Sequence, residues 1–397
     1  MKPIHLISTI LVFATLFCSC NSRDEAAVNS YLGYDIPKDS VSSYIDSKME
    51  EYAIHGISIA VINKGEIVYH ETKGYANVEL KKPITARTIF EGASISKPVF
   101  GMFVMTFVEE GLIDLDTPLY QYLPNDAIAY DERYKKITAR MVLSHRSGFQ
   151  NWREDDENNV LKIQFDPGTD YFYSGEGYQY LAEVLRHLLD TDWDGLEAEF
   201  QKRIANPIGL EHTVFIQNDY TRKHKAEPYD ENNKWVDWKN NYWVKKEDGV
   251  FMAPASIHSE PVDFSKWIVA VMNKDILTPE SYEELLKPHS KIPYDDFDVS
   301  YTLGFVTLHI PFTNLYMHGG NNIGFTSWMA LDTEKDWGYI LFTNSEYGEQ
   351  LGQDFLFYML AGPDKTKLYV TIAFVVIFLI LALIYLFKQL RKKFKKA

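Results

Sequence analysis

Strand-like segments at both ends of the chain enclose a long middle region of helices and loops, and this order constrains the fold most. Ile57–Ile62 and Glu66–Gly74 are runs rich in β-branched and apolar residues, and the turn Asn63-Lys64-Gly65 joins them as a hairpin. Four more short apolar runs follow residue 300: Leu303–His309, Leu315–His318, Ser327–Leu331 and Gly338–Asn344. We therefore predict an α/β (α+β) fold in which both ends of the chain build one antiparallel sheet flanked by helices. A mainly helical lobe is inserted at residues 115–290.

Three helices are predicted next to these strands. The first begins with Ser40 as its cap and buries Ile45 and Met49. The second covers Val99–Glu110 and ends at a glycine, and the third covers Glu346–Leu360.

Two segments predict attachment to a membrane. Residues 1–20 have a basic start, an apolar run and small residues around Cys20, which is the layout of a secretory signal with a candidate lipidation site. An uncleaved signal anchor is the alternative. Residues 21–39 form a polar leader. Leu368–Phe387 has twenty residues without a charge, enough to cross about 30 Å of hydrocarbon, and the uninterrupted run argues against a buried core helix. The basic tail 388–397 predicts a cytoplasmic end and an extracytoplasmic (periplasmic) body on the cell membrane.

Charge and cysteine content exclude several classes of function. The net charge is −15, and six of the cations lie in the last ten residues, so the rest of the chain is more acidic still. It therefore has no basic stripe that could bind nucleic acid. The two cysteines, Cys18 and Cys20, both lie in the predicted signal, which leaves the body without a disulfide or a cysteine metal site. No His-Glu-x-x-His spacing occurs. We expect neither a metal nor another cofactor, and the oligomeric state stays open.

The chemistry is concentrated at Ser94-Ile95-Ser96-Lys97, where an extended segment gives way to a helix. Residues three apart share one helix face, so Lys97 can take the proton of Ser94 and activate it as a nucleophile. An N-cap serine followed by a surface lysine would leave the same pattern. Three other motifs can complete a serine site. They are a polar turn at Leu143–Phe149, a loop with several glycines at Tyr171–Tyr178, and the end of a strand followed by glycines at Met317–Asn321.

Order and spacing of these motifs resemble the penicillin-recognising serine hydrolases, in particular class C β-lactamases, D-Ala-D-Ala carboxypeptidases and related peptidases and esterases. Further stretches carry the likeness: Gly111–Pro118, Tyr122–Pro124, Pro207–Leu210 and Tyr301–Phe305. The resemblance implies a β-lactamase/transpeptidase-like fold, and we place the hydrolase domain at residues 40–362.

The resemblance also implies roles for single residues. Ser94 matches the nucleophile, Lys97 the activating lysine, and Tyr173 the tyrosine that shuttles protons, with the acylation base shared between the last two. His318 matches the first position of the third motif. The amides of Ser94 and Asn321 match the oxyanion donors, and Gly319 and Gly320 let a substrate approach the backbone closely. We expect His145 to be a structural hydrogen-bonding residue.

Two departures from the family pattern affect the predicted substrate. Gly175 stands where the second motif usually has asparagine, which removes a side-chain amide that holds the substrate. His318 replaces the usual lysine, and an exposed histidine there would titrate near about 6.5 and could meet a substrate carboxylate. Both favour a peptidase or esterase over a β-lactamase, so we rank D-amino-acid peptides first, small esters or amides next, and β-lactams last.

Two further hypotheses concern binding. A non-catalytic penicillin- or peptidoglycan-binding receptor of the same fold is the alternative function, and the short tail and the intact Ser94, Lys97 and Tyr173 argue against it. The aromatic stretch Trp235–Trp243 is either packing for a long loop or the wall of a substrate cleft.

Overall fold

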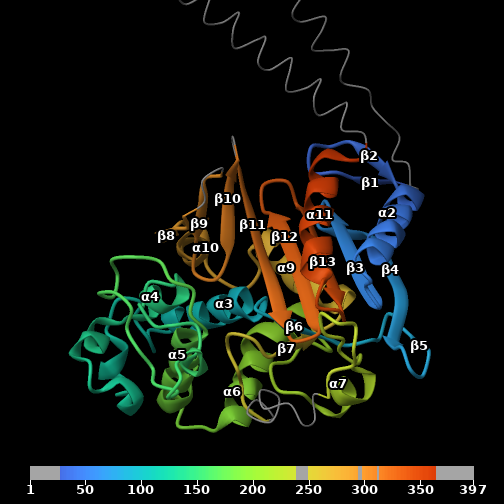
Figure 1. Ribbon diagram of the computed structural model, residues 1–397. Coiled ribbons are helices and arrows are strands. Elements are labelled where there is room, and N and C mark those ends of the chain that lie inside the picture. The colour runs from blue at the N-terminus through green and yellow to red at the C-terminus, as the bar shows by residue number, and fades with distance from the viewer. Residues whose placement is uncertain (1–26, 238–248, 294–296, 311–312, 364–397) are drawn as a thin grey trace, which may run out of the picture.

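A nine-stranded antiparallel sheet forms the centre of the protein (Figure 1). The computed structural model describes residues 27–237, 249–293, 297–310 and 313–363. The strand order is β5-β4-β3-β13-β12-β11-β10-β9-β8, so strands from both ends of the chain meet where β3 pairs with β13. Their bounds are β3 Gly56–Asn63, β4 Glu66–Asn77, β5 Lys82–Pro83, β8 Ser290–Lys291, β9 Val299–Tyr301, β10 Val306–Ile310, β11 Thr313–Asn322, β12 Phe325–Asp332 and β13 Trp337–Thr343. The predicted sheet assembled from both ends is confirmed.

Both faces of this sheet are covered by helices, as the sequence of β3 requires. Ile57, Ile59 and Val61 point to one face, whereas Ala60 and Ile62 point to the other. The first face packs on α2 (Lys38–Glu51) and α11 (Gly348–Ala361). The second packs on α9 (Pro261–Asn273). Because both sets are apolar, β3 is buried along its whole length.

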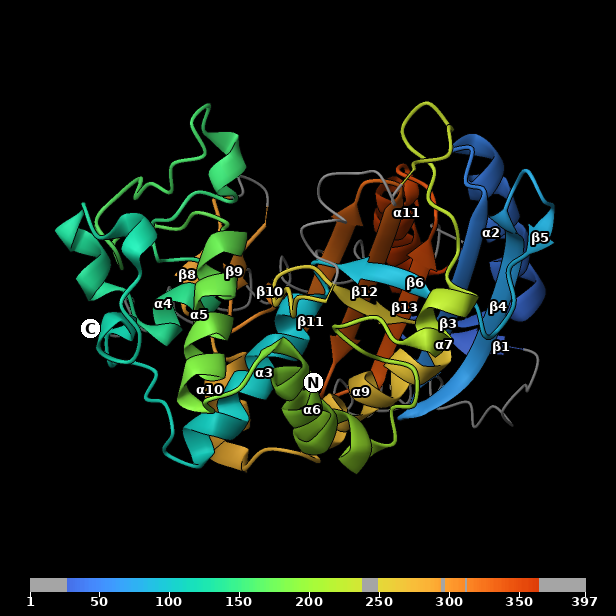
Figure 2. The same cartoon turned by 90° about the horizontal axis from the view of Figure 1, so that it is seen from below.

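The inserted lobe lies beside the sheet, as the view from below shows (Figure 2). It contains α4 (Ala139–Leu143), α5 (Gly175–Leu188), α6 (Trp193–Phe200) and several 3₁₀ turns, and α7 (Asp219–His224) follows near the sheet. The helix α3 (Ser96–Glu109) joins lobe and sheet and is buried from Ser96 to Phe107. It packs on α10 (Pro279–Leu286). The buried α3 explains why the sequence there is apolar on all sides.

Several predicted boundaries are wrong for local reasons. Ser40 does not cap α2, because a two-stranded ribbon of β1 (Ala27–Asn29) and β2 (Asp35–Pro37) leads directly into the helix after Pro37. Leu303 lies outside β10, since Gly304 turns the chain at a φ of +126°. The predicted last helix begins two residues later than expected, at Gly348.

The two membrane predictions fall outside the part of the chain that the structure describes. This applies to the signal at residues 1–20 with Cys20, to residues 21–26 of the leader, to Leu368–Phe387 and to the tail 388–397. The rest of the predicted leader 21–39 is not a polar leader: residues 27–39 form β1, β2 and the start of α2, and Val28 and Ile36 are buried against the sheet. Within the described ranges, no helix has the length and apolar character needed to span a bilayer.

Candidate active site

The candidate nucleophile sits at a sharp junction between a strand and a helix. The strand β6 (Phe90–Ala93) pairs with β7 (Ile257–Ser259) in a small second sheet that the sequence patterns did not reveal. Ala93 has a φ of +48°, which turns the chain so that Ser94 lies between β6 and the start of α3. The hydroxyl of Ser96 donates to the carbonyl of Ala93 at 2.5 Å and accepts from the amide of Ile257 at 2.9 Å. These bonds fix the turn that presents Ser94.

Lys97 reaches Ser94 from the first turn of α3. Its Nζ lies 3.0 Å from the Oγ of Ser94 and 2.9 Å from the carbonyl oxygen of Pro254, and the side chain is only 1% exposed. It also lies 4.5 Å from the ring centre of Tyr173. No carboxylate of the described residues forms an ion pair with it. Burial therefore lowers the pKa of Lys97 well below its ordinary value, which favours the neutral amine beside the serine.

Tyr173 faces the same serine from the loop before α5. Burial raises the pKa of Tyr173, and a hydrogen bond to Ser94 opposes part of this rise. The phenol therefore keeps its proton near neutral pH. His145 holds this loop: its carbonyl accepts from the amide of Phe172 at 2.9 Å, and its Nδ1 accepts from the amide of Ser174 at 3.1 Å. The hydrogen-bonding role expected for His145 thus has a specific target, the loop that carries Tyr173.

His318 lies on β11 at the wall of the site, but it is not the exposed histidine that the sequence allowed. The side chain is 4% exposed. Its Nδ1 lies 2.5 Å from the carbonyl oxygen of Gly319, which can only accept, so Nδ1 carries the proton. Its Nε2 then accepts from the hydroxyl of Tyr301 at 2.9 Å. Burial, with a smaller contribution from Lys97, lowers the pKa of His318 to about 3. A neutral ring with both nitrogens engaged cannot bind a substrate carboxylate as expected.

The glycines after His318 continue β11 instead of ending it. The strand β10 pairs with β11 only as far as Met317, which leaves the following edge of β11 open beside the nucleophile. A Cβ on Gly320 would lie 2.9 Å from the backbone nitrogen of Ser94 and still closer to the carbonyl oxygen of Gly92. Only glycine permits this close approach. The backbone amides of Ser94 and Asn321 stay the predicted oxyanion donors, and the Asn321 side chain donates to Glu346 at 2.8 Å.

Asn151 and Trp152, which the sequence motifs did not mark, lie against Gly175, the position where the family usually has asparagine. A Cβ on Gly175 would lie 2.6 to 2.9 Å from three ring carbons of Trp152. The preceding Asn151 accepts from the amide of Gly175 at 3.0 Å, through its backbone oxygen and through its side-chain Oδ1. Both Asn151 and Trp152 line the cavity above Ser94. Their place two and three residues after the Leu143–Phe149 turn is the signal that could have drawn attention to them.

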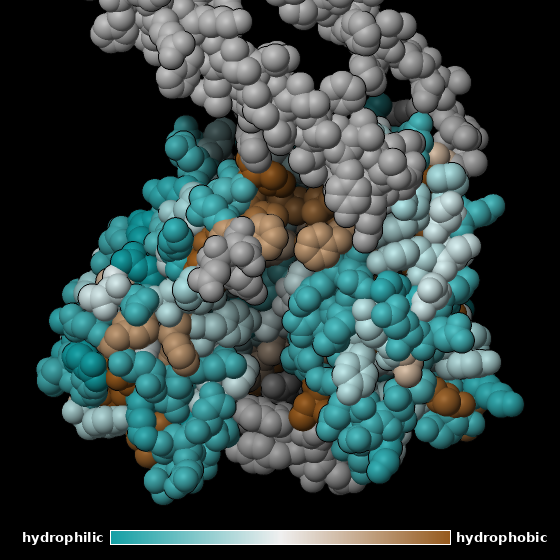
Figure 3. All heavy atoms as spheres, turned by 45° about the horizontal axis from the view of Figure 1, so that its top comes forward, coloured by the Kyte–Doolittle hydropathy of each residue, from teal (hydrophilic) through white to brown (hydrophobic). Residues whose placement is uncertain are grey.

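These groups line one cavity of about 880 Å³. Figure 3 shows apolar side chains gathered around a hollow at the upper centre of the face turned to the viewer. Ser94, Lys97, Tyr173, His318, Gly319, Gly320 and Asn321 all contribute to the wall, whereas Gly175 lies behind Trp152. Apart from Lys97, the charged side chains on the described wall are Glu91 and Glu349. The site thus offers no free cation among its described residues.

A buried ion pair supports this wall from below. Glu91 pairs with Lys225 and accepts a hydrogen bond from the Asn322 side chain at 2.7 Å. Burial would raise the pKa of Glu91, but the charges of Lys225 and His258 and the hydrogen bonds from Lys225 and Asn322 together outweigh it, and the pKa falls to about 2. Trp235 is exposed outside the cavity, and its indole donates to Glu227 at 2.8 Å. The rest of the aromatic stretch, from Trp238 on, lies outside the described residues.

One cluster of the described residues has the composition of a metal site, at the start of α9. It consists of His212, Glu260 and Asp263, none of which lines the cavity. The oxygens of Glu260 accept from the amides of Val262 and Asp263 and so cap the helix. Asp263 accepts from Lys266 and from the amides of residues 211 and 212. These oxygens are already engaged in holding the helix start.

A serine with a buried lysine and a tyrosine, set against an antiparallel sheet with an inserted helical lobe, is the arrangement of the penicillin-recognising serine enzymes. The sequence profile described as Beta-lactamase matches residues 41–361. The chain belongs to this family, and the family predicted from the sequence motifs is confirmed.

Relatives and solved structures agree with this assignment. Protein flp of Staphylococcus aureus (strain NCTC 8325 / PS 47) is 23% identical over 341 residues, which cover 78% of this chain and 64% of that protein. The chain thus spans less than two thirds of that relative. Penicillin-binding protein 4* of Bacillus subtilis (strain 168) is 27% identical over 184 residues, 41% of this chain and 38% of that protein.

Two solved structures share the fold. The octameric penicillin-binding protein homologue from Pyrococcus abyssi has a TM-score of 0.69 and 23% identity, covering 81% of this chain and 76% of that one. D-alanine carboxypeptidase AmpC from Burkholderia cenocepacia has a TM-score of 0.67 and 18% identity, covering 82% of this chain and 98% of that one. At these identities the likeness shows the fold alone.

Proposed function

We propose that this protein is a serine hydrolase that forms an acyl-enzyme on Ser94 and acts on neutral esters or amides. The observation that carries the proposal is the 3.0 Å approach of Lys97 to Ser94 in a site that lowers the lysine pKa. A neutral amine at this distance can take the hydroxyl proton as the serine oxygen attacks a carbonyl. Its burial without a carboxylate partner is what a catalytic base requires and what a surface lysine lacks.

The reaction divides between Lys97 and Tyr173. Lys97 accepts the proton of Ser94, and the Oγ forms a bond to the carbonyl carbon. The amides of Ser94 and Asn321 stabilise the negative oxygen. When the tetrahedral intermediate collapses, the bond to the leaving alcohol or amine breaks and that group takes a proton from Tyr173, whose raised pKa keeps it protonated. Water then attacks the ester carbonyl and gives a proton to the Tyr173 phenolate, the bond between the acyl carbon and the Ser94 Oγ breaks, and Ser94 takes its proton back from Lys97 as the carboxylic acid leaves.

Electrostatics favour a neutral substrate over a carboxylate. D-Ala-terminated peptides and β-lactams carry a carboxylate, and the described wall offers Glu91 and Glu349 but no free cation for it. His318 has both nitrogens engaged. Neutral esters and amides therefore rise above the D-amino-acid peptides ranked first from the motifs. We propose that the Asn151 side-chain amide, oriented by Gly175, binds the substrate carbonyl group in place of the asparagine missing at position 175.

The direct test combines labelling and turnover. A fluorophosphonate should label the full-length protein at Ser94, and a chromogenic ester should be hydrolysed by the same preparation. Labelling without turnover of any ester or amide would favour the non-catalytic receptor. Absence of both would refute the proposal.

We further propose that the catalytic body is extracytoplasmic and attached to the membrane, on the support of the sequence at Cys20 and Leu368–Phe387. Protease added outside intact spheroplasts should remove the body and leave the basic tail protected. Digestion of the tail from outside, or a fully soluble full-length chain, would overturn this proposal.

A further inference from the structure

The cavity that contains Ser94 continues into a section whose wall is almost entirely apolar. We call this section the apolar arm and define it by six residues that line it: Val306, Leu308, Met317, Trp328, Leu356 and Leu360. The whole cavity measures about 880 Å³, near the upper end of the range of about 300–1,000 Å³ for small-molecule sites. A small ester at Ser94 would leave most of this volume unfilled.

Strand pairing and helix periodicity build the arm. Val306 and Met317 are register partners on β10 and β11, so their side chains lie on the same face of the sheet. Leu356 and Leu360 are four residues apart on α11 and share one face of that helix. Side chains from sheet and helix thus form the two walls.

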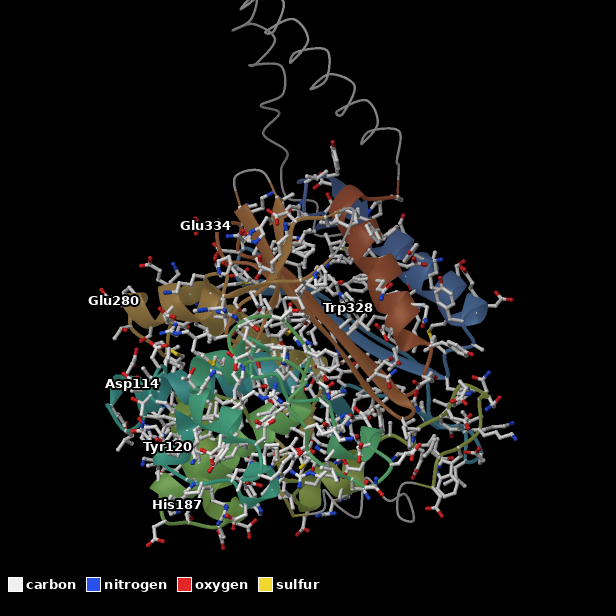
Figure 4. All side chains as sticks on the ribbon, turned by 60° about the vertical axis from the view of Figure 1, so that its left-hand side comes forward. Asp114, Tyr120, His187, Glu280, Trp328 and Glu334 are labelled. Carbon is white, nitrogen blue, oxygen red and sulfur yellow. The ribbon has the colours of Figure 1, made fainter. Side chains whose placement is uncertain are left out.

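Trp328 connects the arm to the catalytic strand. A Cβ on Gly319 would lie 2.8 Å from its ring, and a Cβ on Gly352 would lie 2.7 Å from its side chain, so the tryptophan packs between β11 and α11. Figure 4 shows Trp328 on the sheet next to this helix. Gly319 and His318 are neighbours on β11 and therefore lie on opposite faces of the strand. The arm and the catalytic wall are parts of one cavity, and they can join around the edge of β11 that β10 leaves open beyond Met317.

Large apolar side chains surround the mouth of the arm. Phe357 is 61% exposed and Phe297 is 52% exposed, and both line the same cavity. An exposed apolar rim next to a cavity marks a site that takes an apolar ligand.

The described chain begins at β1 and ends at α11, and both lie at the top of Figure 1. Phe357 and Leu360, near the end of α11, line the cavity. The amide of Tyr31 donates to the carbonyl of Met359 at 2.7 Å, which places the first described segment against the end of α11. Residue 363 is five residues from the predicted membrane segment at Leu368, a reach of at most about 18 Å. The arm therefore opens close to where the sequence predicts the bilayer.

We propose that the apolar arm binds the aliphatic chain of a membrane-borne amphiphile whose neutral ester or amide group reaches Ser94. The inference rests on the proposed function and names its substrate class. Glu349 and the paired Glu91 are the carboxylates on the described wall, which has no free cation, and this favours a neutral or zwitterionic head group. The aliphatic chain of the substrate, attached to the scissile ester or amide, supplies binding energy along the arm. The reaction at Ser94 is the one described for a small ester or amide.

Turnover as a function of chain length tests this substrate class. The full-length protein in lipid nanodiscs is given p-nitrophenyl acetate, butyrate, octanoate and laurate, and in parallel the acetates of short and long alcohols. We expect kcat/KM to rise with chain length in one of the two series. In Phe297→Ser/Phe357→Ser the ratio of kcat/KM for the longest good substrate to kcat/KM for the acetate should fall about tenfold, the value of burying roughly two methylene groups. Leu80→Ser changes an apolar residue that is still more exposed, at 77%, on the far β4–β5 turn; it is the control and should not change the ratio.

A measurement without turnover separates the two proposals. A neutral fatty alcohol carrying a diazirine is photo-crosslinked to the Ser94→Ala protein, and the labelled peptides are identified by mass spectrometry. Labels on β10, β11 and the end of α11 support the arm even if no ester is hydrolysed, in which case only the proposed function fails. The proposal would be overturned by a kcat/KM that does not change with substrate chain length, or by labels elsewhere in the protein. Labelling that occurs only after removal of residues 364–397 would also overturn it, because the protein's own C-terminal segment would then be the occupant of the arm.

Discussion

Adding one methyl group at Gly175 should create a clash that a second substitution removes. Gly175→Ala would place a Cβ 2.6 to 2.9 Å from three ring carbons of Trp152. The backbone cannot retreat easily, because the amides of Gly175 and Glu176 both donate to the carbonyl of Asn151 at 3.0 Å. The Trp152 ring must therefore move.

The expected cost follows from these distances. Overpacking of this kind costs about 1–3 kcal/mol, and alanine in a helix regains up to about 1 kcal/mol relative to glycine. Gly175→Ala should therefore lower the free energy of unfolding by about 1–2 kcal/mol in the wild type. With Trp152→Ala in the background the clash is gone, and the same substitution should be neutral or stabilise by up to about 1 kcal/mol.

Chemical unfolding of the wild type, the two single variants and the double variant, followed by circular dichroism, gives the coupling energy. Gly177→Ala is the matched control in the same helix, since its Cβ would meet its nearest neighbours at an ordinary 3.4 to 3.5 Å. Effects of Gly175→Ala and Trp152→Ala that add within about 0.5 kcal/mol would refute the account of the missing asparagine.

Four further predictions concern the site. Ser94→Ala and Lys97→Ala should each cut kcat by at least about 10³-fold without unfolding the protein, and the double variant should lose no more than either alone, as steady-state kinetics will show. The ratio of kcat/KM for matched anionic and neutral esters should stay constant from mildly acidic to mildly alkaline buffer, because the His318 pKa of about 3 keeps its ring neutral throughout; a ratio that falls with rising pH would contradict this. Asn151→Ala should reduce kcat/KM for amides about tenfold while Asn151→Asp keeps the fold, measured on matched amide and ester pairs. The Glu91 pKa of about 2 lies below its ordinary 4.5, so this carboxylate stabilises the fold above pH 4.5, and the contribution is lost as pH falls towards 2. Glu91→Gln should lower the free energy of unfolding by about 3–5 kcal/mol near neutral pH, as measured by chemical unfolding.

Local patterns were sufficient for the central elements of the fold. The turn Asn63-Lys64-Gly65 predicted the β3–β4 hairpin, and the structure gives Lys64 and Gly65 the positive φ values of 57° and 73° that such a turn needs. The apolar runs after residue 300 predicted most of β10 to β13, since each strand is set by its own sequence. The order of the motifs predicted which side chains meet at the cavity.

Features that depend on distant contacts were not accessible in this way. The β6–β7 pair joins residues more than 160 positions apart, so no local pattern marks it. The burial of His318 depends on Tyr301 and on the turn at Gly304 that presses against α3, where a Cβ would lie 2.9 Å from the carbonyl oxygen of Lys97. Trp152 reaches Gly175 across 23 positions, which motif spacing does not encode.

The central claim is that neutral Lys97 activates Ser94 to form an acyl-enzyme. The most direct measurement mixes the full-length protein with a slowly deacylated neutral ester, stops the reaction in acid and locates the added acyl mass by peptide mass spectrometry. The account predicts the acyl group on Ser94 in the wild type, a rate of acylation that falls in acidic buffer as Lys97 becomes protonated, and almost no adduct in Lys97→Met. Hydrolysis of the ester with no adduct on Ser94, or an undiminished adduct in Lys97→Met, would contradict it.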